Sequence, residues 1–326
     1  MRINIGVLGK ANIALRSIIP TLAELSEQFE IVAIATRSKA DGESEINGIP
    51  VIEGYDQLLE IDTLDAVYIP LPIGMHYEWI RKALNKGLHV WVEKSLASTE
   101  SEVKELISLA KEKQLVVLES FQFRFHKQLK SIQESLKDGV IGEVRSFRAS
   151  FGFPPFPDAD NIRYQKSLGG GALLDAGAYT LKTAALFLGK DVEVVAAQLV
   201  MDEDRQVDIY GNGMLKTKDG ASTAQVSFGF DNYYQCGIEV WGSKGKLFTN
   251  RLFTARKGFV PQMTIESNEG SKTVDLPEDD AFTNFALYFH TMLTKKNSDL
   301  LNEEYEQNLL QSALITKFNE KALNNV

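Results

Sequence analysis

The chain has 326 residues, enough for one large domain or two ordinary domains with their own hydrophobic cores. Hydrophobic residues make up 44% and charged residues 24% of the sequence, which excludes a disordered or fibrous protein. The net charge of −9 argues against nucleic acid and anionic membranes as partners, so an anionic ligand needs a local basic pocket.

Cysteine occurs once, as Cys236 in an alternating strand pattern, so we expect a buried thiol, no internal disulfide and a reducing compartment. The sequence shows no apolar leader and no run of 18 uncharged apolar residues. We therefore expect no membrane span and a cytoplasmic protein. The four histidines are scattered, so we predict no metal site.

Short apolar runs alternate with helical patterns over the first 120 residues. The runs cover 3–8, 29–35, 66–69, 89–92 and 115–118. Between the last two, Thr99 and Glu102 form a capping box before apolar residues at helical spacing. This alternation predicts β-α-β units around a parallel sheet, in a Rossmann domain over residues 1–121.

The pattern changes over residues 122–326. A helix that ends at Gly139 precedes an alternating strand, a run of three glycines and a helix extending to about Leu188. Further strands are predicted over 192–201, 205–217, 221–230 and 233–241, with Asp219-Gly220 as a hairpin turn, and helices near 282–293 and 303–323 close the chain. We predict a second, α+β domain with an open, mainly antiparallel sheet.

The segment after the first strand has the spacing of a dinucleotide-binding turn. In Gly9-Lys10-Ala11-Asn12-Ile13-Ala14, alanine replaces the second and third glycines of the fingerprint. Such a turn lets backbone N–H groups at a helix N-terminus meet a pyrophosphate. An ordinary strand-to-helix turn has the same pattern, so the ends of the other strands decide between the two interpretations.

The second strand ends in Thr36-Arg37-Ser38-Lys39, where NAD-binding sites usually carry an acidic residue for the ribose 2′-hydroxyl. Arg37 can bind a 2′-phosphate with both arms of its guanidinium, and Ser38 and Lys39 can assist. We therefore predict NADP(H) rather than NAD(H) as the cofactor. The alternative is a solvated basic loop.

Two further strand ends carry candidate site residues. Pro70 through His76 follow the strand at 66–69, and Glu93-Lys94-Ser95 follow the strand at 89–92. Ligands of an open parallel sheet bind outside the carboxyl ends of its strands, so Lys94 is a candidate for chemistry. In the absence of a cofactor site, a lysine at this position is more often a surface charge.

In the second domain, Asp175 and Tyr179 are four residues apart and share one face of the helix that follows Gly169-Gly170-Gly171. The glycines allow another surface to approach the start of this helix closely. In the alternative interpretation, Asp175 interacts with the helix dipole and Tyr179 is a half-buried core aromatic.

Together these motifs resemble the Gfo/Idh/MocA oxidoreductase family. The matching segments keep the family's order and spacing over about residues 3–190, and they are the Gly9 turn, Leu71-Pro72 through His76, Glu93-Lys94 and Gly169 through Tyr179. Further segments look most like the sugar-nucleotide 3-ketoreductases of this family, namely Ala11, Arg16, Phe153-Pro154-Pro155, Ile162-Arg163-Tyr164, Trp241-Gly242 and residues 251–254.

The resemblance implies roles for individual residues. Lys94 would be the catalytic proton donor, with Tyr179 beside it at the reacting carbonyl. Positions that touch the cofactor correspond, by this similarity, to Tyr55, Leu71, His76, Glu93, Arg163 and Asp175. Positions that touch the sugar nucleotide correspond to Arg16, Tyr234 and Thr254.

The chain departs from the family pattern in two places. Relatives usually have proline, often after a cis bond, where this chain has Ser95. A cis bond before serine costs about 2.5 to 4 kcal/mol, so we expect the loop that carries Lys94 to sit differently. Many relatives have histidine where Tyr179 stands, so its role is carried over from the tyrosine-bearing branch.

The favoured function is an NADP(H)-dependent reductase that transfers a hydride to the carbonyl of a nucleotide sugar, where Lys94 and Tyr179 stabilise the oxygen. Two alternatives stay open: a dehydrogenase of a free sugar or diol that uses the same two residues, and a non-catalytic NADP(H)-sensing protein on the same fold. Cations available for a diphosphate are Lys10, Arg16, Arg251, Arg256 and Lys257.

We also expect a homodimer or homotetramer. One face of the second-domain sheet packs on helices, and the other face would expose Phe and Val residues in a monomer.

Overall fold

The computed structural model describes residues 1–37, 44–295 and 297–323. The chain divides into two compact units, which we describe separately. The first contains Met1–Phe121 and Phe282–Leu309, and the second contains Gln122–Ala281 and the residues from Leu310 onward. The sequence predicted that all of residues 122–326 form the second domain, whereas the structure places Phe282–Leu309 in the first unit.

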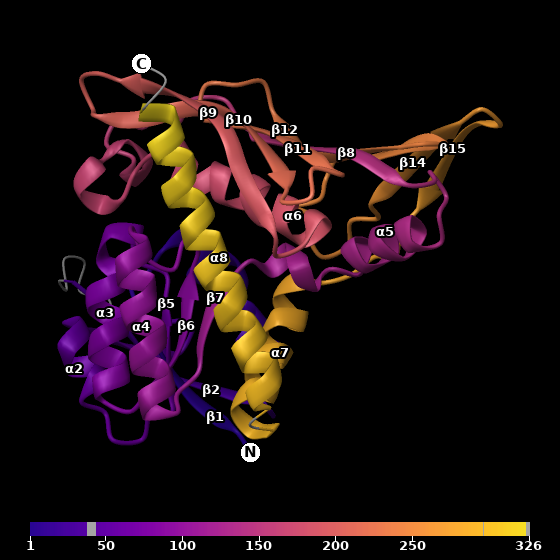
Figure 1. Cartoon of the computed structure of the whole chain (residues 1–326). Coiled ribbons are helices and arrows are strands. Elements are labelled where there is room, and N and C mark those ends of the chain that lie inside the picture. Colours follow the sequence, from indigo (N-terminus) through magenta and orange to yellow (C-terminus); the bar gives the residue numbers. More distant parts are fainter. Residues whose placement is uncertain (38–43, 296, 324–326) are drawn as a thin grey trace. The chain divides into compact units, whose positions relative to one another are not determined.

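The first unit is built on a sheet with the strand order β3-β4-β2-β1-β5-β6-β7. Figure 1 labels β1, β2, β5, β6 and β7 of this sheet. Its strands are β1 (Ile3–Leu8), β2 (Phe29–Thr36), β3 (Glu45–Ile46), β4 (Ile49–Glu53), β5 (Ala66–Ile69), β6 (His89–Glu93) and β7 (Val117–Ser120). Neighbouring strands are parallel except β3 and β4. The predicted parallel sheet is confirmed, and β3 and β4 are additions that the sequence did not predict.

The predicted apolar run at 115–118 begins two residues before strand β7. The prediction is shifted because the last two residues of β7 are polar, although they are buried. Ser120 accepts a hydrogen bond from the indole Nε1 of Trp91 at 2.7 Å. Glu119 accepts one from the backbone N–H of Leu96 at 2.8 Å. A buried polar side chain with a hydrogen-bond partner is compatible with a strand such as β7, at the edge of the sheet, although hydropathy alone does not identify it.

Helical segments connect these strands. They are η1 (Ala14–Ile18), α1 (Ile19–Glu24), α2 (Tyr55–Leu59), α3 (Ile73–Asn85) and α4 (Glu100–Lys113). The predicted capping box at the start of α4 is confirmed: the Thr99 hydroxyl accepts from the N–H of Glu102 at 3.2 Å, and the Glu102 carboxylate accepts from the N–H of Thr99 at 3.0 Å.

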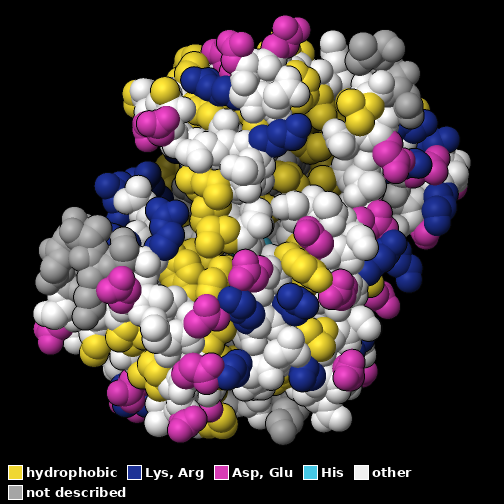
Figure 2. Space-filling view, turned by 90° about the vertical axis from the view of Figure 1, so that its left-hand side faces the viewer, with side chains coloured by type: hydrophobic (Ala, Val, Ile, Leu, Met, Phe, Trp, Pro, Cys, Tyr) yellow, Lys and Arg dark blue, Asp and Glu magenta, His cyan; other side chains and the backbone are white. Residues whose placement is uncertain are grey.

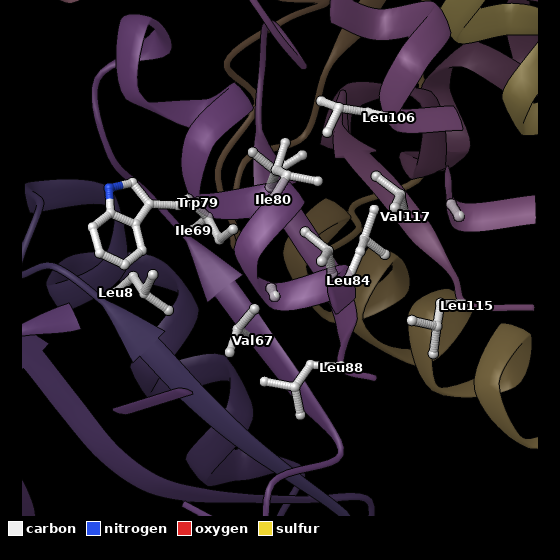
Figure 3. Close-up of a cluster of buried hydrophobic side chains, with 14 of the residues drawn as sticks. Leu8, Val67, Ile69, Trp79, Ile80, Leu84, Leu88, Leu106, Leu115 and Val117 are labelled. Atoms are coloured by element: carbon white, nitrogen blue, oxygen red, sulfur yellow. The ribbon is translucent and has the colours of Figure 1, made fainter. Parts of the chain in front are cut away.

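Alternate residues of the strands point to opposite faces of the sheet. On one face, Val67 and Ile69 of β5 belong to a buried cluster with Ile80 and Leu84 of α3 (Figure 3). Each of these four side chains is fully buried. Burial of one such aliphatic side chain contributes about 1.5 to 3 kcal/mol, so this cluster is a main source of stability for the unit.

Helix α7 (Ala281–Lys295) from Phe282 onward, and helix α8 (Ser298–Leu323) as far as Leu309, complete the first unit. On the sheet face opposite that cluster, the ring of Trp91 lies 5.0 Å from that of Phe285 and 5.6 Å from that of Phe289, both in α7. The hydroxyl of Tyr305 in α8 donates to the backbone oxygen of Leu115 at 2.7 Å. These contacts explain why residues 282–309 depart from the predicted domain boundary.

The second unit is built on a sheet with the order β15-β14-β13-β12-β8-β11-β10-β9. Its strands are β8 (Val144–Gly152), β9 (Val192–Asp202), β10 (Val207–Thr217), β11 (Thr223–Gly229), β12 (Gln235–Gly242), β13 (Gly245–Thr249), β14 (Gln262–Ser267) and β15 (Gly270–Asp275). Neighbours are antiparallel except β8 and β11, which confirms the prediction of a mainly antiparallel sheet. Strands β13 to β15 were not predicted; β15 is largely exposed and lacks an apolar alternation.

Helical segments of this unit are η2 (Gln122–Phe125), α5 (Lys127–Lys137), η3 (Ile162–Tyr164), η4 (Lys166–Leu168), η5 (Leu173–Gly177) and α6 (Ala178–Leu188). Helix α6 packs on the sheet, and Phe187 stacks on Phe147 of β8 with ring centres 4.9 Å apart. The last turns of α8 cover the same face, because Gln311 donates to the backbone oxygen of Ala178 at 2.8 Å. Cys236 is buried in β12, as predicted.

Basic and acidic side chains are interspersed on the face shown in Figure 2. Charged side chains of the first unit form ion pairs, such as Lys82 with Asp56 at 3.0 Å and Lys86 with Glu60 at 2.6 Å. Such exposed pairs contribute little to stability, about 0 to 1 kcal/mol each. In the part of the chain that the structure describes, no helix combines the length and the apolar composition that crossing a bilayer requires.

Candidate functional site

The turn after β1 brings together three of the predicted cofactor residues. Gly9 has a φ of +104°, which strongly favours glycine, and its N–H donates to the backbone oxygen of Ala35 at 2.8 Å. A Cβ at Gly9 would lie 3.0 Å from Leu71 Cδ2 and 3.8 Å from the Tyr55 hydroxyl. Because residue 9 has no side chain, the space between its backbone and the side chains of Leu71 and Tyr55 stays open. A turn whose backbone N–H groups bind a pyrophosphate requires such a space.

The helix that follows this turn begins at Asn12 and contains the π-helical turn η1. Ala11 and Ile13 are half-buried, and Asn12 is exposed. Arg16 is an exposed residue of η1. Isolated π turns occur often at functional sites, so η1 is consistent with a binding role for this segment.

Arg37 follows β2, the strand that neighbours β1, and is exposed. Burial raises the pKa of the Tyr55 phenol, and the positive charge of Arg37 opposes this rise, which places the two groups close together. Arg37, Tyr55 and Gly9 thus lie at one end of adjacent strands. Ser38 and Lys39, the two predicted helpers of Arg37, lie outside the described residues.

His76 links the loops that follow β5 and β6. Its side chain is fully buried, with Nδ1 2.8 Å from the backbone oxygen of Ser95 and Nε2 2.7 Å from that of Leu71. Burial lowers the pKa of His76 to about 4; the two carbonyl groups oppose this shift, and the charge of Lys94 adds to it. A neutral imidazole carries one N–H, so His76 donates to one of these two backbone oxygens, and its buried ring lies between the loop of Leu71 and the loop of Lys94.

Lys94 follows the last residue of β6 and is half-buried. The Lys94–Ser95 peptide bond is cis, contrary to the expectation drawn from the serine. The neighbouring carboxylate of Glu93 accepts a hydrogen bond from the Tyr68 hydroxyl at 2.8 Å.

The predicted glycine-led helix of the second unit starts with the π-helical turn η5, which contains Asp175, and continues as α6, which contains Tyr179. Asp175 accepts a hydrogen bond from Nε of Arg163 at 2.5 Å. Burial lowers the pKa of the Arg163 guanidinium, and Tyr179 opposes this effect, so the guanidinium also lies near the phenol. The structure therefore groups Arg163, Asp175 and Tyr179.

The glycine run allows the close approach that the sequence predicted. A Cβ at Gly170 would lie 2.6 Å from the backbone oxygen of Arg163, and one at Gly171 would lie 2.2 Å from Oδ1 of Asp208. Gly171 also has a φ of +117°. A side chain at either glycine would push the start of the helix away from these neighbours.

Asp208 is a candidate positioning residue that the sequence analysis missed. It lies in β10, and its carboxylate accepts from the N–H of Leu173 at 2.6 Å, at the start of η5. Burial raises the pKa of Asp208 to about 6, although hydrogen bonds from Leu173 and Ala172 oppose the shift. The chain separates Asp208 from η5 by more than 30 residues, and no periodicity in the sequence signals this contact.

Aromatic rings surround the half-buried Tyr179. Its ring centre lies 5.1 Å from that of Phe151, 5.6 Å from that of Phe253 and 5.8 Å from that of Phe123. Such edge and tilted contacts hold an aromatic ring in one orientation. Tyr179, a predicted catalytic residue, is therefore held in one orientation by the apolar rings around it.

The structure also brings together two residues that the resemblance assigned to the sugar nucleotide. The Tyr234 hydroxyl lies 2.9 Å from Oγ1 of Thr254, which is also 3.3 Å from Sγ of Cys236. In residues 1–37, 44–295 and 297–323, no group of three or more His, Cys, Asp or Glu side chains could hold a metal ion.

Acid should destabilise the protein through His76. Its pKa in the folded protein, about 4, lies below the ordinary 6.5, so the unfolded chain takes up the proton first as the pH falls. The stability that His76 contributes is present above pH 6.5 and is lost between pH 6.5 and 4, by up to about 3 kcal/mol. Urea unfolding of wild type and His76→Gln between pH 7.5 and 4.5 measures this loss.

As the pH falls, we expect the free energy of unfolding to decrease less in His76→Gln than in wild type. In the control His290→Gln we expect the same decrease as in wild type. Carbon-13 NMR of the histidine rings provides a second readout on the wild-type protein. A His76 ring that titrates near pH 6.5 would contradict the assignment.

Comparisons with known proteins agree with this geometry. Residues 3–121 match a model described as "Oxidoreductase family, NAD-binding Rossmann fold", and residues 129–248 match a model of the GFO/IDH/MocA C-terminal domain. The chain is 44% identical to a dTDP-3,4-didehydro-2,6-dideoxy-alpha-D-glucose 3-reductase from Actinomadura kijaniata, over 86% of this chain and 84% of the relative. It is 34% identical to an NADP(+) D-xylose 1-dehydrogenase from Haloferax volcanii, over 81% and 80%.

Among solved structures, the chain is similar to KijD10, a 3-ketoreductase from Actinomadura kijaniata in complex with NADP and TDP-benzene. The TM-score is 0.94, the sequence identity is 40%, and the match covers 98% of each chain.

Proposed function

The chain belongs to the GFO/IDH/MocA oxidoreductase family, and on this premise we propose that it is an NADP(H)-dependent reductase of a keto group in a sugar linked to thymidine diphosphate. The observation that carries the proposal is the placement of Gly9, Arg37 and Lys94 after three strands whose carboxyl ends meet at one sheet edge. The 3-reductase and KijD10 resemble the chain more than the xylose dehydrogenase does, which favours a nucleotide sugar over a free sugar.

Residues of the first unit fit the cofactor. The turn at Gly9 and the helix start behind it suit the pyrophosphate, and Arg37 suits a 2′-phosphate with its planar, bidentate guanidinium. Tyr55 and Leu71 line the space beside Gly9. When bound, NADPH supplies the hydride that reduces the carbonyl carbon.

Lys94 and Tyr179 act on the carbonyl oxygen in this proposal. As the carbon is reduced, negative charge develops on the oxygen, and positively polarised donors stabilise it. The ammonium of Lys94 donates its proton to that oxygen, which completes the alcohol. The Tyr179 hydroxyl donates a hydrogen bond to the same oxygen and orients the ketone.

The remaining predicted residues support these two groups. The buried ring of His76 contacts the loop of Lys94 at the backbone oxygen of Ser95. Arg163 and Asp175 form an ion pair next to the helix of Tyr179. Arg16, Tyr234 and Thr254 are proposed to contact the sugar nucleotide.

Removal of either donor should lower kcat. In Lys94→Met and Tyr179→Phe, the carbonyl oxygen loses a donor in the transition state, and we expect kcat to fall about a hundredfold or more. The measurement is the steady-state oxidation of NADPH with a thymidine-diphosphate-linked 3-keto sugar. Lys86→Met and Tyr233→Phe are matched controls, since Lys86 pairs on the surface with Glu60 and Tyr233 is 87% exposed.

If both Lys94→Met and Tyr179→Phe keep kcat within about tenfold of wild type, a change of about 1.4 kcal/mol in the barrier, the proposed chemistry is wrong. Faster turnover of a free sugar such as xylose with NADP⁺ than of the nucleotide-linked substrate would favour the dehydrogenase alternative. Absence of turnover with any keto sugar would favour the sensing alternative.

Arg37 should set the preference for NADPH. Loss of its charge-assisted hydrogen bonds to the 2′-phosphate should lower kcat/KM for NADPH about ten- to a hundredfold in Arg37→Ala, with little change for NADH. The ratio of the two kcat/KM values checks this, with Arg2→Ala as a control that removes a surface arginine paired with Glu30. Equal losses with both cofactors would show that Arg37 does not recognise the 2′-phosphate.

We propose that the protein associates through the open face of the second sheet. Exposed apolar residues of this sheet include a valine, as expected, together with types that were not expected: they are Val195, Tyr210, Met214 and Trp241, at 37%, 36%, 40% and 59% exposure. Phe147 and Phe151 point to the buried face instead. Light scattering at micromolar concentration should give a dimer or tetramer, and Trp241→Glu should weaken it more than the control Tyr233→Glu. A monomeric wild type would contradict the proposal.

A further inference from the structure

Arg251 lies in the loop after β13, with its guanidinium against two aromatic rings. Its Cζ is 5.2 Å from the ring centre of Tyr234 and 5.7 Å from that of Phe259. Its Nη1 donates to the Tyr234 hydroxyl at 3.3 Å. Contact with aromatic rings restricts the orientation of the guanidinium, and four of its five N–H groups remain for other acceptors.

The positive charge of Arg251 is not neutralised locally. Within the described ranges 1–37, 44–295 and 297–323, no carboxylate forms an ion pair with Arg251. Two cations nearby in the sequence do pair: Lys246 with Glu266 at 3.1 Å and Lys257 with Asp280 at 3.9 Å. The protein as a whole has a net charge of −9, so an anionic ligand needs a local positive charge. An exposed guanidinium that is held in one orientation and forms no ion pair with a carboxylate can provide it.

The same loop reaches the ring of Tyr179. Phe253, two residues after Arg251, has its ring centre 5.6 Å from that of Tyr179. Two peptide units span at most about 7.6 Å between Cα atoms, so the Cα of Arg251 lies no farther than this from that of Phe253, one of the aromatic residues around Tyr179. A nucleotide sugar whose ketone is bound at Tyr179 carries its diphosphate on another carbon of the same ring.

We infer that Arg251 binds the diphosphate of the nucleotide sugar, with the Tyr234 hydroxyl holding its guanidinium in place and Thr254 holding that hydroxyl. This inference rests on the proposed function and adds the residue that recognises the phosphate groups. A planar guanidinium matches two phosphate oxygens at once, which an ammonium cannot do. The other phosphate source is NADP(H) itself, so the experiment must separate the two ligands.

The test measures binding of thymidine diphosphate, thymidine and NADP⁺ to the full-length protein by calorimetry. In Arg251→Ala we expect the Kd for thymidine diphosphate, measured with NADP⁺ present, to rise about ten- to a hundredfold. The Kd values for thymidine and NADP⁺ should stay within about twofold of wild type. Arg251→Lys keeps the charge without the planar group, and we expect an intermediate loss.

Arg145→Ala is the matched control, because Arg145 is an exposed arginine of the same unit whose partner is Glu143. Equal affinity of Arg251→Ala and Arg145→Ala for thymidine diphosphate would overturn the inference while leaving the proposed function intact. Loss of NADP⁺ affinity in Arg251→Ala would assign the arginine to the cofactor instead. A wild type that binds no thymidine diphosphate would overturn both the inference and the proposed nucleotide sugar.

Discussion

Parallel pairing of the strands in the first unit is the constraint on which the candidate site depends. Because β1, β2, β5 and β6 run in one direction, the segments that follow them meet at one edge of the sheet. For this reason Gly9, Arg37, Leu71 and Lys94 all follow strands at the same edge of the sheet, although more than 80 residues of sequence separate the first from the last. The buried cluster between β5 and α3 and the contacts of Trp91 with α7 hold this sheet in place.

In the second unit, a comparable constraint acts on the helix of Tyr179. The glycines at 170 and 171 let the backbone near Arg163 and the carboxylate of Asp208 reach the start of the helix. Asp208 then satisfies backbone N–H groups that would otherwise lack a partner. The helix start is thus fixed by polar contacts, and the phenol of Tyr179 by aromatic rings.

Much of this was predictable from local patterns. Apolar runs located the strands that pair in parallel, the capping box located α4, and the turn at Gly9 and the glycine run marked the positions where the backbone needs space. The sequence did not predict contacts that depend on packing between distant segments. These include the packing of α7 and Tyr305 in the first unit, the hydrogen bond from the start of η5 to Asp208, and the burial of His76 between two loops. Buried polar side chains resemble surface residues in a hydropathy pattern, which is also why β7 was placed two residues early.

The central claim is that Lys94 and Tyr179 act on one carbonyl oxygen beside the nicotinamide. A crystal structure of the protein with NADP⁺ and a thymidine-diphosphate-linked sugar tests this most directly. The account predicts that Nζ of Lys94 and the hydroxyl of Tyr179 both lie within about 2.6 to 3.2 Å of the same sugar oxygen. Side chains more than about 12 Å apart, far beyond that hydrogen-bonding range and in separate surroundings, would contradict it.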